Sequence, residues 1–161
     1  MSYSCVIDSY AWVEYFRGSE AGRKAKEYIE GGESVTASIT LAELKEKYAR
    51  EGTPSFDDDL VFIMSSTVLV DLTKDIAVRA GATNAAMKKK VKGWGMADSI
   101  ILATAQSSNA RVLTGDRHFR GIKQAILSAN SAHWFPKSSA RGGPCPSSAR
   151  DLIMSSSLPD C

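Results

Sequence analysis

The chain has 161 residues, 43% of them hydrophobic, which is enough apolar material for the core of one globular domain. Its formal net charge of +2 neither requires nor excludes a nucleic-acid partner. The three cysteines, Cys5, Cys145 and Cys161, form no CxxC pair and have no histidine at zinc-finger spacing, which argues against a disulfide framework and a zinc site. The N-terminal residues contain neither a basic region nor an apolar run of membrane-spanning length, so we expect a cytoplasmic protein without a membrane partner.

The first third of the chain alternates apolar runs with helical patterns. A strand is predicted at residues 3–7, and it leads through Asp8 into a helix that ends near Phe16. A charged surface helix is predicted at 21–29. Asp8 thus stands at the carboxyl end of a strand, where open α/β sheets bind their ligands. An aspartate at this position can equally be an ordinary helix cap.

A second strand is predicted at residues 34–39, which are rich in β-branched side chains, and a helix at 40–50 follows it. Thr40 and Glu43 have the spacing of a capping box, in which the glutamate accepts a hydrogen bond from the backbone of the cap residue. Taken alone, Glu43 is better explained by this structural role than by a functional one.

The next helix begins with three adjacent acids at residues 57–59, which suit the positive end of a helix dipole. Three adjacent helical residues cannot all face one metal ion, so we leave these acids out of the site. A third strand is predicted at 67–72, and a helix runs from Asp75 to Met87. Lysines at 88, 89, 90 and 92 follow it, either as complements to the helix dipole or as contacts to phosphate.

The segment GMADSIILATA, residues 95–105, predicts a helix that is apolar on most sides and carries one carboxylate, Asp98. Burying an unpaired carboxylate is costly. Asp98 must therefore be paired, be hydrogen-bonded, or face a cation in a cleft. The simplest of these explanations is that Asp98 caps its own helix.

The last part of the domain contains a predicted strand at 109–113, followed by a turn with Asp116. Residues 122–127 fit either a short strand or a helical turn. His118 and His133 lack metal-ligand spacing to each other or to cysteine, and we interpret both as surface or packing residues.

The composition changes at Lys137, after which Ser, Pro, Gly and Arg dominate and the apolar periodicity ends. We therefore predict a folded domain over residues 1–136 and a flexible tail over 137–161. The tail receives no functional role.

Four acids stand where a strand ends or a helix begins: Asp8, Glu43, Asp98 and Asp116. In a parallel sheet with right-handed crossovers, such positions can converge on one crevice. Four carboxylates brought together raise one another's pKa unless a divalent cation neutralises them, and ligands that are all oxygen favour Mg²⁺ or Mn²⁺. Such an ion suits phosphate chemistry.

The segments VIDSYAWVEYF, SITLAEL, GMADSIILATA and LTGDRHF together resemble the PIN-domain ribonucleases, most closely the VapC-like toxins of type II toxin-antitoxin pairs. The resemblance implies a three-layer α/β/α fold with a central parallel sheet and a metal-dependent endoribonuclease. It also implies a homodimer and a small antitoxin that covers the site. Asp8, Glu43, Asp98 and Asp116 match the family's acids, which hold one or two Mg²⁺ or Mn²⁺ ions and support hydrolysis of RNA.

Three further residues are secondary candidates. Ser9 follows the first acid as in the family, Thr114 falls where the family often has a hydroxyl near the metal, and Arg117 is placed to contact the RNA backbone. Tyr10 departs from the family, many members of which have a small polar residue there. The alternative function is a catalytically inactive PIN-like module that binds RNA or a protein. A Mg²⁺-dependent phosphatase is less well supported, because no lysine and hydroxyl pair accompanies a nucleophilic aspartate.

Overall fold

Five parallel strands form the central sheet of the molecule, and the computed structural model describes residues 3–127. Their order across the sheet is β3-β2-β1-β4-β5. The strands are β1 (Cys5–Ile7), β2 (Ser34–Ala37), β3 (Val68–Val70), β4 (Arg111–Thr114) and β5 (Ala125–Leu127). Of the two possibilities left open for residues 122–127, the structure therefore has a short strand.

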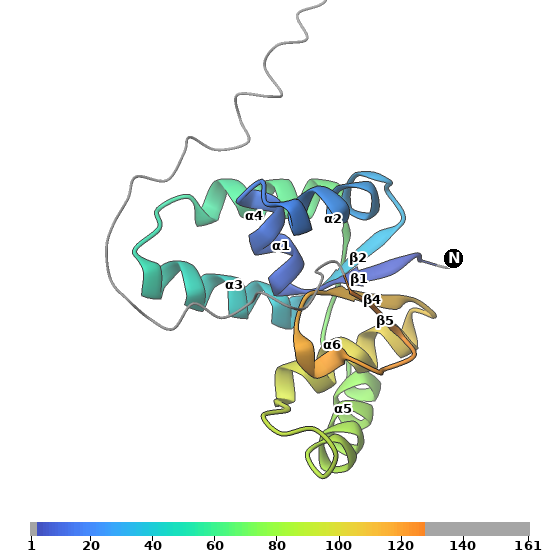
Figure 1. The fold of residues 1–161 in the computed structure, drawn as a ribbon. Coiled ribbons are helices and arrows are strands. Elements are labelled where there is room, and N and C mark those ends of the chain that lie inside the picture. The colour runs from blue at the N-terminus through green and yellow to red at the C-terminus, as the bar shows by residue number, and fades with distance from the viewer. Residues whose placement is uncertain (1–2, 128–161) are drawn as a thin grey trace, which may run out of the picture.

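Six α-helices and a 3₁₀ helix connect the strands. They are α1 (Ser9–Phe16), α2 (Glu20–Glu30), α3 (Ser38–Glu51), α4 (Phe56–Ser66), α5 (Lys74–Met87), α6 (Met96–Ser107) and the 3₁₀ helix η1 (Arg117–Phe119). Helices α1, α2 and α4 lie on one side of the sheet, and α5 and α6 lie on the other (Figure 1). The predicted three-layer α/β/α fold with a central parallel sheet is confirmed.

The two faces of the sheet bury different side chains because neighbouring residues of a strand point in opposite directions. In β1, Cys5 and Ile7 pack with Trp12 of α1 in one apolar cluster. Val6, between them, packs with Ile101 of α6 in the other. All five of these side chains are buried, so the middle strand is held from both sides.

All five strands are shorter than the segments predicted for them, and two of these differences affect the site or the edge of the sheet. The strand expected at 34–39 ends at Ala37, because Ser38 is already the first residue of α3. The strand expected at 67–72 is limited to Val68–Val70, which pairs with β2 alone at the edge of the sheet. Since β2 is short, its partner has few backbone groups to bond with.

The predicted tail at 137–161 and His133 lie outside the described residues, so the boundary at 136 stays a prediction. Within residues 3–127, none of the helices has the length and apolar character required to cross a membrane.

Candidate metal centre

The site lies at the carboxyl edge of the sheet, between β1 and β4. The chain builds outward from β1 through β2 to β3, and then adds β4 and β5 on the other side of β1. Such a reversal of strand order opens a crevice outside the carboxyl ends of the strands. Asp8 follows β1 directly and Asp116 comes two residues after β4, so both acids lie at this switch point.

Asp8 is 5% exposed, and both of its carboxylate oxygens accept hydrogen bonds. Oδ1 accepts the backbone N–H of Ser9 at 2.7 Å, which caps α1. Oδ2 accepts the hydroxyl of Thr114 at 2.6 Å. The same hydroxyl oxygen accepts the backbone N–H of Asp116 at 2.9 Å, so the buried Thr114 side chain connects the two acids.

The pKa of Asp8 is raised to about 6, chiefly because burial disfavours the charged form. The hydrogen bonds from Thr114 and Ser9 lower it, and the charges of Asp116 and Asp98 raise it further. The desolvation therefore outweighs two good hydrogen bonds.

Asp98 lies in the first turn of α6 and caps it. Its Oδ2 accepts the backbone N–H of Gly95 at 2.7 Å. Burial raises the pKa of Asp98, the Gly95 hydrogen bond lowers it, and the charge of Asp116 raises it. The carboxylate is thus a helix cap that also lies within electrostatic reach of a second acid.

The predicted capping box of Thr40 and Glu43 does not form. Helix α3 begins at Ser38 and its N-cap is Ala37, so Thr40 and Glu43 lie inside the helix rather than at its start. The capping interpretation is wrong because the preceding strand ends earlier than its β-branched composition indicates. Instead, Glu43 Oε2 is a buried oxygen with no hydrogen-bond partner within the described residues.

Glu43 lies close to the other three acids. Burial is the main cause that raises its pKa to about 7, and the charges of Asp8, Asp98 and Asp116 raise it as well. The hydroxyl of Ser9 lowers it. All four acids expected at the site are therefore near enough to interact electrostatically, and the structure brings them together from four separate segments.

These residues fit a hard divalent cation. Within residues 3–127, no lysine or arginine nitrogen lies within ion-pair distance of the four carboxylates. An unpartnered buried carboxylate oxygen such as Glu43 Oε2 is costly to leave without a donor or a cation. Carboxylate oxygens are the ligands that Mg²⁺ and Mn²⁺ prefer.

Sequence reasoning missed a histidine at this site. Asp98, Asp116 and His118 each offer a ligand atom, and these atoms all lie within 4.8 Å of one another. His118 Nδ1 is 3.1 Å from Asp116 Oδ1, which also accepts the His118 backbone N–H at 2.9 Å. Describing His118 as a surface or packing residue was therefore incomplete. The sequence offers no signal for this position, because a lone histidine forms no spacing pattern with other metal ligands.

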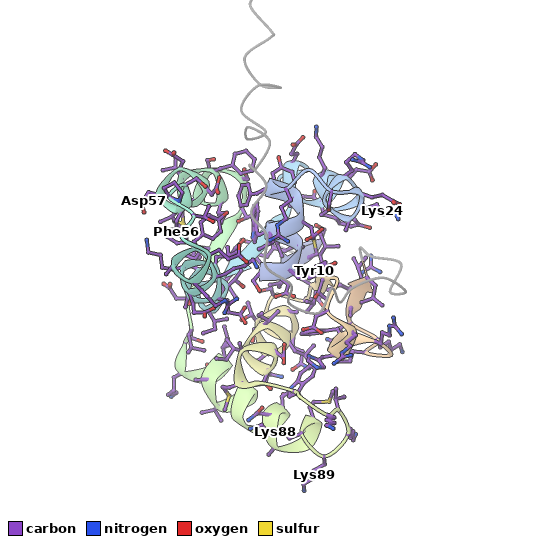
Figure 2. The ribbon with its side chains drawn as sticks, turned by 60° about the vertical axis from the view of Figure 1, so that its left-hand side comes forward. Tyr10, Lys24, Phe56, Asp57, Lys88 and Lys89 are labelled. Carbon is purple, nitrogen blue, oxygen red and sulfur yellow. The ribbon has the colours of Figure 1, made fainter. Side chains whose placement is uncertain are left out.

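Two secondary candidates lie against Asp8. The hydroxyl of Ser9 is 3.3 Å from Asp8 Oδ1, and Thr114 donates to Oδ2 as described. Tyr10, labelled in Figure 2, is a residue of α1. It lies beside the turn after β4, since a Cβ built on Gly115 would be only 1.9 Å from Tyr10 Cε1. Arg117 is exposed and lines a cavity together with His118 and Arg120.

The comparisons with known proteins agree with this geometry. Solved structures with the same fold include a toxin-antitoxin complex from Klebsiella pneumoniae, with TM-score 0.62 and 23% identity over 78% of this chain and 98% of that one. VapBC2 from Rickettsia felis, bound to a promoter DNA fragment, has TM-score 0.61 and 20% identity over 79% and 97%. VapC20 from Mycobacterium tuberculosis, a sarcin-ricin loop cleaving toxin, has TM-score 0.60 and 14% identity over 72% and 92%.

Among proteins with curated descriptions, none matches this chain. The family comparison is decisive, because the model of the PIN domain matches residues 5–124 and so covers most of the chain and all four acids. The chain belongs to the PIN domain family.

Proposed function

We propose that this protein is a divalent-metal-dependent endoribonuclease and the toxin of a toxin-antitoxin pair. The observation that carries the proposal is the cluster of four interacting carboxylates, in which Glu43 Oε2 is buried without a hydrogen-bond partner among residues 3–127. A domain that only binds RNA or protein has no need for such a cluster. The structural neighbours support the biological role, since they include a toxin-antitoxin complex and a toxin that cleaves the sarcin-ricin loop.

Asp8, Glu43, Asp98 and Asp116 are the residues proposed to hold one or two Mg²⁺ or Mn²⁺ ions. When bound, such an ion supplies Lewis-acid polarisation of a phosphoryl oxygen and makes water a better nucleophile. The reaction is hydrolysis, in which a water oxygen bonds to phosphorus and the bond from phosphorus to the leaving ribose oxygen breaks. That leaving oxygen takes a proton.

The chain's own contribution is to hold the carboxylates in place before the substrate arrives. Thr114 fixes Asp8 and the backbone of Asp116 through one hydroxyl. The N-termini of α1 and α6 fix Asp8 and Asp98 through backbone N–H groups. Because these partners belong to strands and helices rather than to long loops, the acids are preorganised for catalysis.

Protein partners form part of the same proposal. We infer a small antitoxin that covers the site and, from the family resemblance alone, a homodimer. The antitoxin is supported by the neighbours from Klebsiella pneumoniae, Rickettsia felis and Salmonella typhimurium, which are toxin-antitoxin assemblies, two of them bound to DNA.

RNA cleavage by Asp98→Asn tests the enzymatic part. The amide oxygen of asparagine can still accept the Gly95 N–H, so the substitution removes the charge and keeps the cap. With Mg²⁺ or Mn²⁺ we expect a loss of about 100-fold or more in cleavage rate, by analogy with other groups that stabilise transition-state charge. EDTA should abolish the wild-type activity. Asp57→Asn is the matched control, because Asp57 is an exposed acid far from Tyr10 in Figure 2.

Cleavage that survives both EDTA and Asp98→Asn would contradict the metal mechanism. Tight RNA binding with no turnover in either metal would favour the alternative, an inactive PIN-like binding module. Growth arrest on expression, abolished by Asp98→Asn but not by Asp57→Asn, tests the role as a toxin.

A further inference from the structure

A cavity of about 710 Å³ opens beside the carboxylate cluster, and the proposed function does not use it. Its lining comes from two segments, the middle of the α5–α6 connection and the 3₁₀ helix η1 with the residue after it. The lining residues are Val91, Lys92, Gly93, Arg117, His118 and Arg120.

The charge of this cavity is opposite to that of the neighbouring acids. Lys92, Arg117 and Arg120 bring three positive charges to its rim, and all three residues are exposed. Among the described residues, no aspartate or glutamate lines the cavity. His118 connects the two regions, because its ring lines the cavity and contacts Asp116.

A contact in the hydrophobic core fixes the two segments that line the cavity relative to each other. Trp94 and Phe119 are both buried, with ring centroids 5.1 Å apart, and this pair joins the α5–α6 connection to η1. Trp94 Nε1 also donates to the hydroxyl of Ser99 in α6 at 2.6 Å. Trp94 is therefore a core residue and does not stack on a base from the cavity.

Gly93 lines the cavity next to His118. Its φ of +87° lies in the left-handed region that favours glycine, and a Cβ there would be 3.0 Å from His118 Nε2. A larger residue would push the imidazole out of place. The backbone thus approaches His118 as closely as a residue without a side chain allows.

We propose that this cavity binds a phosphate of the RNA strand adjacent to the phosphate that is cleaved. The proposal rests on the proposed function. A polyanion that approaches four carboxylates is repelled, and cations fixed next to them offset this repulsion and set the position of the strand. Asp116 and Arg117 are consecutive residues, so one short segment serves both the acid cluster and the cavity.

The structure separates the four lysines that the sequence groups together. Only Lys92 lines the cavity. Lys88 and Lys89 lie at the far end of the molecule from Tyr10 in Figure 2. We therefore expect Lys92→Ala to weaken RNA binding more than Lys89→Ala does.

The test is the affinity of the full-length protein for a single-stranded RNA in EDTA, where no cleavage occurs, measured by fluorescence anisotropy across a salt series. Arg120→Ala and Lys92→Ala should each raise Kd about three- to tenfold and lower the salt slope by ~0.7, the value for one phosphate contact on a single strand. Arg50→Ala and Lys24→Ala are the matched controls. Arg50 and Lys24 are exposed, belong to α3 and α2, and should leave Kd close to that of the wild type.

Cleavage kinetics provide a second readout. Because the phosphate bound in the cavity is not the reacting one, Arg120→Ala should raise KM and leave kcat within about twofold. Inorganic phosphate should compete with RNA only at millimolar concentrations or above, which distinguishes a strand-binding site from a site for free phosphate. Competition at micromolar phosphate would overturn the assignment to the strand.

The cavity proposal and the proposed function can fail independently. If Arg120→Ala and Arg50→Ala lose RNA affinity equally, the protein attracts RNA through its overall positive charge rather than through the cavity. The cavity proposal is then wrong, whatever the nuclease activity. If the wild-type protein binds RNA through the cavity but cuts none in Mg²⁺ or Mn²⁺, the proposed function is wrong and the phosphate site stands.

Discussion

At the level of single residues, three of the four acids have both a structural role and a candidate metal-binding role. Asp8, Asp98 and Asp116 each accept a backbone N–H at the start of a helix. A carboxylate has two oxygens with several acceptor positions, so one N–H does not exhaust it. The helix dipole that favours an anionic cap also helps to keep the carboxylate ionised. One aspartate side chain can therefore cap a helix and bind a metal ion at the same time.

Glu43 is the exception, and it gives the sharpest prediction at this scale. Its Oε2 has no hydrogen-bond partner in the part of the chain that the structure describes, and burial and the other acids raise its pKa to about 7, so its ionised form destabilises the metal-free protein. Glu43→Gln removes that charge. We expect the free energy of unfolding in EDTA near pH 8 to rise by about 1 kcal/mol, as measured by urea denaturation.

The same variant should lose most of the stabilisation that Mg²⁺ or Mn²⁺ gives the wild type, because one ligand is gone. Glu46→Gln is the control, since Glu46 lies on the same helix but is exposed and pairs with Arg50. A Glu43→Gln variant that is less stable in EDTA and still responds fully to metal would show that Glu43 has a structural role instead.

At the level of elements, the turn between β4 and η1 depends on contact with α1. A Cβ at Gly115 would be 1.9 Å from Tyr10 Cε1, so glycine is required here for space rather than for its backbone conformation. The ring of Tyr10 in turn lies against Gly115, which stands between Thr114 and Asp116. This explains how a bulky residue is accommodated where a small polar one was expected from the resemblance.

Gly115→Ala should therefore destabilise the protein by about 1–3 kcal/mol in urea denaturation, the usual penalty of overpacking. In the double variant with Tyr10→Ala, the added methyl group has room, and its cost should largely disappear. Gly81→Ala serves as the control, because nothing lies within 4 Å of a Cβ built there and alanine is favoured in a helix. If Gly115→Ala lowers the free energy of unfolding equally in the wild-type and the Tyr10→Ala backgrounds, the added methyl group does not clash with Tyr10.

The elements were predictable from sequence where local patterns decide them. The alternation of apolar strands and helices predicted the parallel sheet, and the strand-end positions of Asp8 and Asp116 followed from it. Helix starts were less predictable, since α3 begins at Ser38 although the β-branched run continues to Ile39. That error of a few residues gave Glu43 a capping role, because a capping box is defined only relative to the first residue of its helix.

His118 and the cavity could not be predicted for a different reason. The position of His118 against Asp98 depends on how η1 packs through Phe119 on Trp94, a contact between residues 25 positions apart. A lone histidine has no pattern of its own in the sequence. Likewise, only the fold shows that Lys92 lines a cavity with Arg117 and Arg120.

At the level of the whole molecule, the carboxylate cluster makes stability depend on pH and on metal together. Asp8 and Glu43 ionise near pH 4–5 in an unfolded chain but near 6 and 7 in the folded one. Between about pH 4.5 and 7 the folded state therefore keeps protons that the unfolded state has released, so stability falls as pH rises. Above pH 7 the whole penalty is present, on the order of a few kcal/mol.

A divalent cation should reverse this dependence, because it binds the ionised carboxylates and competes with their protons. We expect the melting temperature in EDTA to be lower near pH 8 than near pH 5.5, and saturating Mg²⁺ or Mn²⁺ to raise it by several degrees near pH 8 and by much less near pH 5.5. Glu20 and Glu51, whose pKa values are lowered by lysine partners, act in the opposite direction but only below about pH 4.5, outside this window. The double variant Asp8→Asn with Glu43→Gln should flatten both the pH dependence and the response to metal. An equal rise in melting temperature at both pH values would mean that the metal binds elsewhere, and the four acids would then require a different explanation.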